Sequence, residues 1–140
     1  MRVVVFVKAT ADSEAGHLPS TELLTAMGKY NEDLVNAGIL VAGEGIKPSS
    51  AGKRVAFDGP GRTVIDGPFA VPSELVAGFW IWQVKDMAEA VEWAKRCPNP
   101  MPGPSELELR PVFSAEDFAP VMTEDLIAQE DALRARIAKL

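Results

Sequence analysis

The sequence predicts an α+β domain in which two helices pack on one face of a mostly antiparallel sheet. Apolar strand-like runs and amphipathic helix patterns follow one another in the order strand, helix, strand, hairpin, strand, helix, strand. This is the order of a ferredoxin-like βαββαβ unit with a hairpin insert. The length of 140 residues suits one domain with a real core. We assign the domain to residues 1–113 and a C-terminal helical extension to residues 114–140.

The first strand and helix are marked by clear local signals. Residues 3–7 are β-branched or aromatic and predict a buried strand, whereas the small and polar residues 9–19 predict a loop. A helix is expected over 21–37, because Ser20 precedes it as an N-cap and Gly38 follows it. Its apolar stripe consists of Leu23, Met27, Tyr30 and Leu34.

The middle of the chain predicts a short strand and a hairpin. Residues 39–42 form the strand, and the following "GEGIKPSSAG" reads as a loop without the spacing of a nucleotide-binding loop. Residues 54–57 and 62–65 flank an Asp-Gly-Pro-Gly turn and predict the two arms of the hairpin. The second arm runs directly into Asp66-Gly67-Pro68-Phe69, so this DGPF stretch is expected to be the turn that leaves the hairpin.

The remaining elements are a very apolar strand, a second helix, a last strand and a terminal helix. Residues 78–84, "GFWIWQV", form the strand, and a helix begins after Asp86, which has Glu89 at capping-box spacing. Residues 106–112 alternate between apolar and charged side chains, as half-buried strands do. A last helix is expected from the cap Thr123 to about residue 138.

One face of the predicted sheet is left without a cover. Two helices cover only one side of a four-stranded sheet, so either Trp80 and Trp82 or Phe79 and Ile81 remain on the other. Bare apolar faces of this size are rare on monomers. We therefore expect a homodimer formed through the sheet face, with a pocket between the two sheets or at its mouth.

Bulk properties exclude several classes of function. The net charge of −6 argues against a nucleic-acid-binding surface. Cys97 is the single cysteine, and no cluster of His and Asp residues predicts a metal site, so we expect neither a metal nor another cofactor. The apolar runs are too short to span a membrane, and we expect a cytoplasmic location.

Four blocks of sequence carry a resemblance to a known family. They are "AGILVAGEGIKPSSAGKRV", "TVIDGPFAVPSELVAGFWIWQV", "MAEAVEWAKRCP" and "ELELRPV". In this order they resemble the YCII-related family, in its branch named for the DGPF motif, over about residues 1–113. The resemblance implies a ferredoxin-like fold that dimerises into an α/β barrel. It also implies a neighbourhood of sigma-factor genes, and hence a link to sigma-factor regulation.

The resemblance does not carry a catalytic pair over to this chain. Some relatives are thought to use a His in the first helix and an Asp after the second. The corresponding positions here are Met27 and Cys97, and the one histidine, His17, lies in the predicted loop before the first helix. Whether the chain is an enzyme is therefore left open.

Asp66 and Phe69 of the DGPF stretch are the first candidate site residues. The Asp66 carboxylate could accept a proton or bind a ligand, or it could bond its own backbone in a turn. Phe69 could form a pocket wall or plug the core. Glu44, between two glycines, is a second candidate acid or base.

Further candidates for ligand contact lie on the predicted sheet and first helix. Glu108 and Arg110 share a strand face, and Arg110 could bind an anionic ligand or form an ion pair. Tyr30 and Trp82 could either line a pocket or pack in the core.

Three functions are consistent with these features. The first is a homodimer that binds a small molecule between the sheets or near the DGPF turn. The second is an enzyme of lyase or isomerase type that uses Asp66 or Glu44. The third is a structural interaction module whose partner surface is the helix at 123–138.

Overall fold

The computed structural model describes residues 1–140 and confirms an α+β architecture with antiparallel sheets. The main sheet has the strand order β2-β5-β1-β6, and every neighbouring pair is antiparallel. Its strands are β1 (Arg2–Lys8), β2 (Leu40–Gly45), β5 (Val76–Gln83) and β6 (Leu107–Pro111). This order is compatible with the expected ferredoxin-like unit.

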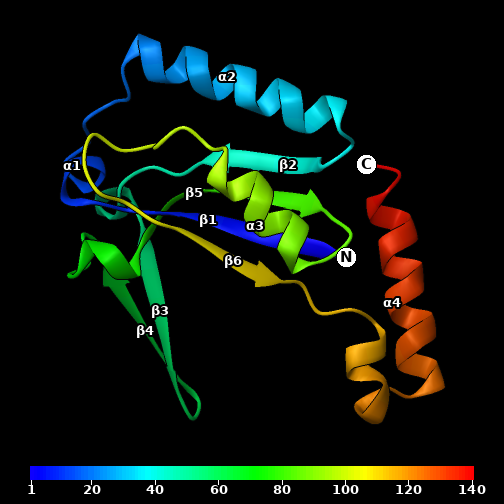
Figure 1. The fold of residues 1–140 in the computed structure, drawn as a ribbon. Helices are drawn as coiled ribbons and strands as arrows, with labels where there is room; N and C mark the ends of the chain where they lie inside the picture. The colour runs from blue at the N-terminus through cyan, green and yellow to red at the C-terminus, as the bar shows by residue number, and fades with distance from the viewer.

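The expected hairpin is present as a separate two-stranded sheet, which follows β2 and precedes β5 along the chain. It consists of β3 (Lys53–Asp58) and β4 (Gly61–Asp66), which are paired only with each other. Figure 1 shows this hairpin extending away from the main sheet, on the side opposite to α2.

Two helices lie over the same face of the main sheet (Figure 1). They are α2 (Thr21–Asn36) and α3 (Met87–Lys95), and both carry the expected caps. The Ser20 hydroxyl accepts a hydrogen bond from the Leu23 N–H at 3.1 Å, and the Asp86 carboxylate accepts one from the Glu89 N–H at 2.9 Å. The cap residues therefore set where these helices begin.

The prediction of a plain loop over residues 9–19 is wrong. A short helix, α1 (Ala11–Glu14), forms there, and Thr10 and Ser13 bond each other's backbone N–H groups in a capping box. Three 3₁₀ turns also occur, at η1 (Ser49–Ala51), η2 (Pro72–Glu74) and η3 (Glu116–Val121).

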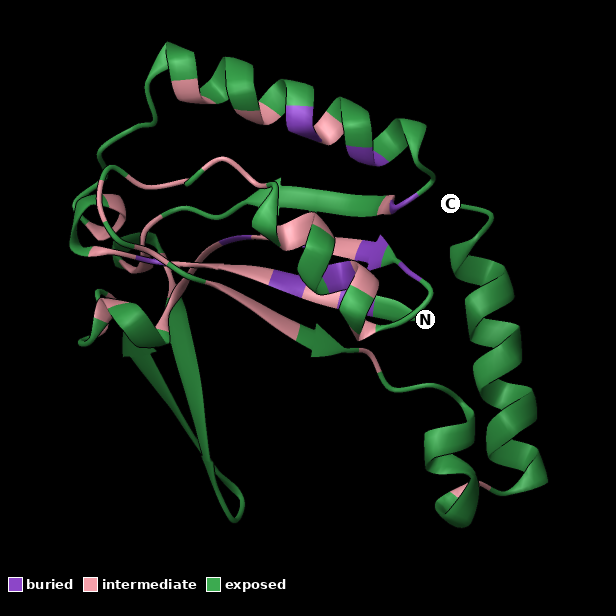
Figure 2. Ribbon diagram, viewed as in Figure 1, coloured by how far each residue is buried: buried purple, intermediate pink, exposed green.

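The core lies between the main sheet and its two helices. Val3, Val5, Leu34 and Trp82 are completely buried there, and Figure 2 shows the buried residues concentrated in this layer. Trp80 and Trp82 both face the helices, so the open alternative is settled and Phe79 and Ile81 lie on the other face.

The second face of the main sheet has no buried side chain. Register defines two rows across it from β2 to β6: Glu44, Phe79, Phe6, Glu108 and then Ala42, Ile81, Val4, Arg110. The apolar members of these rows are half-buried except for the exposed Ala42. Glu44 and Glu108 end the first row, and Arg110 ends the second. Only 11 of the 140 residues are buried, so this chain on its own leaves much apolar surface in water.

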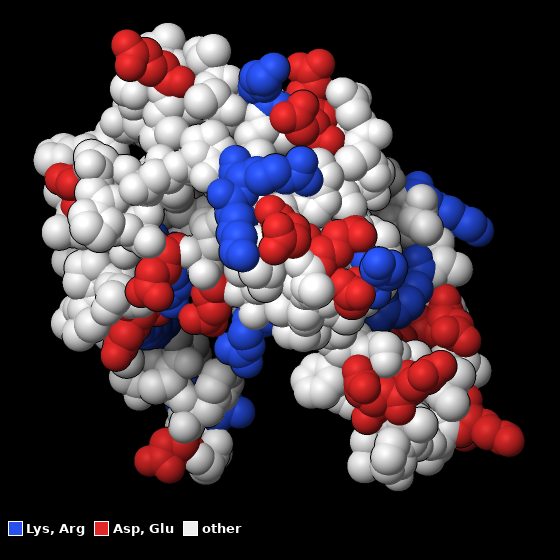
Figure 3. Space-filling model, in the orientation of Figure 1, with Lys and Arg blue, Asp and Glu red and all other residues white.

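Two appendages stand apart from the core. One is the β3–β4 hairpin and the other is the extension, where η3 is followed by α4 (Glu124–Ile137) behind the expected cap Thr123. Neither contributes to the core cluster. In Figure 3 they project as two legs with open space between them, and acidic and basic side chains are interspersed on the visible face. None of the helices combines the length and the hydropathy that crossing a bilayer would require.

Candidate functional site

One edge of the main sheet gathers four chain segments around a cavity. Since β1 and β2 are both antiparallel to β5, their C-terminal ends lie at the same edge as the start of β5. β6 is antiparallel to β1 and also begins there. A cavity of about 810 Å³ lies at this edge, and it is lined by Val7, Asp12, Ser13, residues 16–20, Leu23, residues 45–48, Ala77 and residues 99–102. This volume lies within the range of small-molecule sites.

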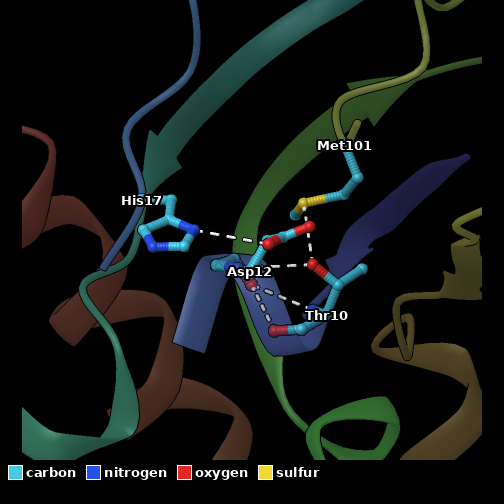
Figure 4. A network of polar contacts seen from close by, with 5 residues as sticks. Thr10, Asp12, His17 and Met101 are labelled. Carbon is cyan, nitrogen blue, oxygen red and sulfur yellow. Dashed lines mark hydrogen bonds and ion pairs between the residues drawn. The ribbon is translucent and has the colours of Figure 1, made fainter. Parts of the chain in front are cut away.

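A histidine and a carboxylate meet at this cavity (Figure 4). His17 Nδ1 lies 3.3 Å from an Asp12 carboxylate oxygen, and both side chains are largely exposed. On the other side, the Thr10 hydroxyl donates to the Met101 sulfur at 3.4 Å, which ties α1 to the proline-rich loop. No three His, Cys, Asp or Glu side chains gather as metal ligands anywhere in the chain.

The DGPF turn is attached to a wall of this cavity through Ser49. The Glu14 carboxylate accepts hydrogen bonds from the Ser49 backbone N–H at 3.1 Å and from the Ser49 hydroxyl at 2.5 Å. The same hydroxyl accepts the backbone N–H of Phe69 at 3.0 Å. Because Ser49 directly follows the lining residues 45–48, these bonds fix that wall between α1 and the DGPF turn.

The DGPF turn requires a glycine at position 67 because the backbone of Ser49 lies too close for a side chain. A Cβ built on Gly67 would lie 1.7 Å from the Ser49 carbonyl oxygen, which is far inside any permitted contact. The Gly67 N–H also donates to the Gly52 carbonyl at 3.0 Å. The Arg54 guanidinium lies 3.9 Å from the centre of the Phe69 ring. The turn therefore closes the base of the hairpin against the loop at 49–52. We call the contacts of Glu14, Ser49, Gly67 and Phe69 the DGPF lock.

The sequence-predicted acids lie outside the cavity. Asp66 pairs with Lys53 at 2.5 Å across the base of the hairpin, and its side chain is 73 % exposed. Glu44 is exposed on the uncovered face of the main sheet, beside Phe79 in register. Phe69 is half-buried within the DGPF lock. None of the three residues Asp66, Glu44 and Phe69 lines the cavity.

Glu108 and Arg110 are brought together on the uncovered face, as their spacing of two predicts. Their side chains form an ion pair at 3.4 Å, and the Lys8 ammonium lies 3.8 Å from the other Glu108 oxygen. Tyr30 and Trp82 instead lie in the core. The Tyr30 hydroxyl donates to the Trp93 carbonyl at 2.6 Å, and burial raises the pKa of this phenol above its ordinary value.

Cys97 is also half-buried and chemically quiet. Burial raises the pKa of its thiol to about 11, and the thiol donates to the Pro98 carbonyl at 3.2 Å. The thiol is therefore protonated at neutral pH, whereas a reactive cysteine needs its thiolate form.

Sequence reasoning missed the residues that line the cavity, including Asp12, His17, Lys47 and Met101. Three signals were available. Thr10 and Ser13 have the spacing of an N-cap and its third helical residue, and the prolines at 98–104 interrupt the chain just before β6. In addition, the predicted topology already places the ends of β1 and β2 at one edge of the sheet.

Comparison with known families adds one result. The family model of the YCII-related domain matches residues 1–114. The chain belongs to the YCII-related family. The matched span of this YCII-related protein contains all six strands, the DGPF lock and the whole cavity lining, while η3 and α4 follow it. A search of the curated proteins gives no match.

Proposed function

We propose that this YCII-related protein binds a small molecule in the cavity at the sheet edge, next to the DGPF turn. The observation that carries the proposal is a cavity of about 810 Å³ whose wall is held by the DGPF lock. Preformed sites of this kind bind with little loss of conformational entropy. This proposal keeps one of the two locations that the sequence suggests and gives it different residues. Its setting is the cytoplasm.

We also propose that the protein acts as a homodimer through the uncovered sheet face, which would complete an α/β barrel. The half-buried residues of the two rows, Val4, Phe6, Phe79 and Ile81, would supply the apolar centre. Charges of both signs flank it, as a polar rim does. Light scattering at micromolar concentration should report about twice 15.1 kDa, and Phe6→Glu should reduce this to one chain. A single-chain mass for the unmodified protein would end the dimer proposal.

A thermal-shift screen with a metabolite panel tests the binding proposal. A compound that binds only the folded state raises the melting temperature. Leu23 lines the cavity from α2, whereas its neighbour Leu24 is 58 % exposed and does not line it. We expect Leu23→Trp to remove the shift by filling the cavity, and Leu24→Trp to retain it. Equal shifts of the melting temperature in both variants would show that the compound binds outside this cavity.

A role as an interaction module is the second candidate, because α4 is a well-capped helix with no buried residue. Leu126, Ile127, Leu133 and Ile137 are all at least 45 % exposed on it. A protein partner that co-purifies with the full chain, but not with a chain ending at residue 113, would favour this function. An acid–base role for Asp66 or Glu44 gains no support, since neither side chain lines the cavity.

A further inference from the structure

Most polar side chains that line the cavity are already committed to partners within the protein. The Asn99 carbonyl oxygen accepts from the Met101 N–H at 3.0 Å and from the Ser105 hydroxyl at 2.5 Å, and its amide nitrogen donates to Gly103. The hydroxyls of Ser13 and Ser20 serve the caps of α1 and α2. Asn99 and Ser13 therefore have little bonding capacity left for a ligand, whereas Ser20 keeps its O–H donor.

The ionisable lining residues differ in the same respect. The Asp12 carboxylate has the His17 ring as a hydrogen-bond partner at 3.3 Å. Lys47, in the segment after β2, makes no ion pair and no side-chain hydrogen bond. It is the one charged lining residue without a partner. Lys47 is exposed, so an anionic group on a bound ligand gains a charge-assisted hydrogen bond to this ammonium that a neutral ligand lacks.

The rest of the lining is apolar and contains no phenyl or indole ring. It includes Val7, Leu18, Leu23, Ile46 and Met101, together with prolines from three loops. Methionine sulfur and its methyl group pack well against flat rings. The lining therefore suits a ligand whose body is apolar and whose charge is confined to one end.

We propose that the cavity accepts a hydrophobic carboxylate, with the anionic head at Lys47 and the apolar body among the aliphatic and proline side chains. This inference rests on the proposed function and adds the class of ligand. The net charge of −6 means that the protein as a whole repels anions, so binding of an anion would be specific to the cavity.

Calorimetric titration with three naphthalene probes tests the class. The probes are 2-naphthoate, 2-naphthylmethanol and 2-naphthylmethylamine. They share the naphthalene ring system and differ in the charge of the polar group attached to it. We expect 2-naphthoate to bind about tenfold more tightly than the alcohol, as a hydrogen bond to a charged group allows. Lys47→Met should abolish that preference. Lys29→Met, on an exposed position of α2 outside the cavity, should retain it.

The outcomes separate this inference from the proposed function. Equal affinities for the three probes, tightest binding of the amine, or an unchanged preference in Lys47→Met would each overturn the anionic class. If no probe binds while a panel compound still stabilises the protein through Leu23, the class is wrong and the site stands. If neither the probes nor the panel depends on Leu23, the proposed function itself fails.

Discussion

The DGPF lock makes a quantitative prediction about Glu14 and Ser49. Ser49 donates both its backbone N–H and its hydroxyl to the Glu14 carboxylate, and its hydroxyl accepts the Phe69 N–H. A hydrogen bond to a charged group contributes about 1.5–3 kcal/mol, and a part-buried group left unpaired costs about 1–3 kcal/mol. Glu14→Ala and Ser49→Ala should therefore each lower the free energy of unfolding by about 2–3 kcal/mol.

The double variant should lose less than the sum of the two single losses, because both substitutions remove the same hydroxyl–carboxylate bond. We expect a coupling energy of about 1.5 kcal/mol. Urea unfolding followed by fluorescence of the three tryptophans measures it. Ser50→Ala is the matched control, since Ser50 adjoins Ser49, is exposed and makes no side-chain hydrogen bond. Additive losses within about 0.5 kcal/mol would refute the lock.

Two further predictions concern stability. Gly67→Ala should lower the free energy of unfolding, measured in urea, by about 3 kcal/mol or more, because its Cβ would overlap the Ser49 carbonyl. The control Gly28→Ala, in open space within α2, should raise it by about 1 kcal/mol. Equal effects of the two substitutions would contradict the close approach. The free energy of unfolding should begin to fall above about pH 9 and keep falling to about pH 11, because the unfolded chain releases the proton of Cys97 before the folded one does. Tyr30 has a raised pKa and adds a loss in the same direction at higher pH. Unfolding free energies for the Cys97→Ala, Tyr30→Phe double variant that still fall between pH 9 and 11 would contradict this assignment.

Local signals account for what the sequence predicted correctly. Ser20, Asp86 and Thr123 each cap the helix expected to follow them, because an N-cap acts only on the next three residues. The alternation in "GFWIWQV" separated Trp80 and Trp82 from Phe79 and Ile81, but could not say which pair the helices cover. That choice depends on which face the helices cross, which is a property of the whole fold.

The site escaped prediction because its residues are distant in sequence. Asp66 was a candidate by residue type, yet its exposed carboxylate forms an ion pair with Lys53, its neighbour across the hairpin. Ser49 looked like an ordinary loop serine, yet it joins α1 to the DGPF turn. Such long-range contacts leave no periodic pattern in the sequence.

The central claim is that the cavity at the sheet edge binds the ligand, and the five methionines test it in one titration. Met101 alone among them lines the cavity, while Met1, Met27, Met87 and Met122 lie elsewhere. With ¹³C-methyl-methionine protein, addition of the stabilising compound should move the Met101 signal saturably and leave Met122 unchanged. Saturable binding that leaves the Met101 signal in place would contradict the account.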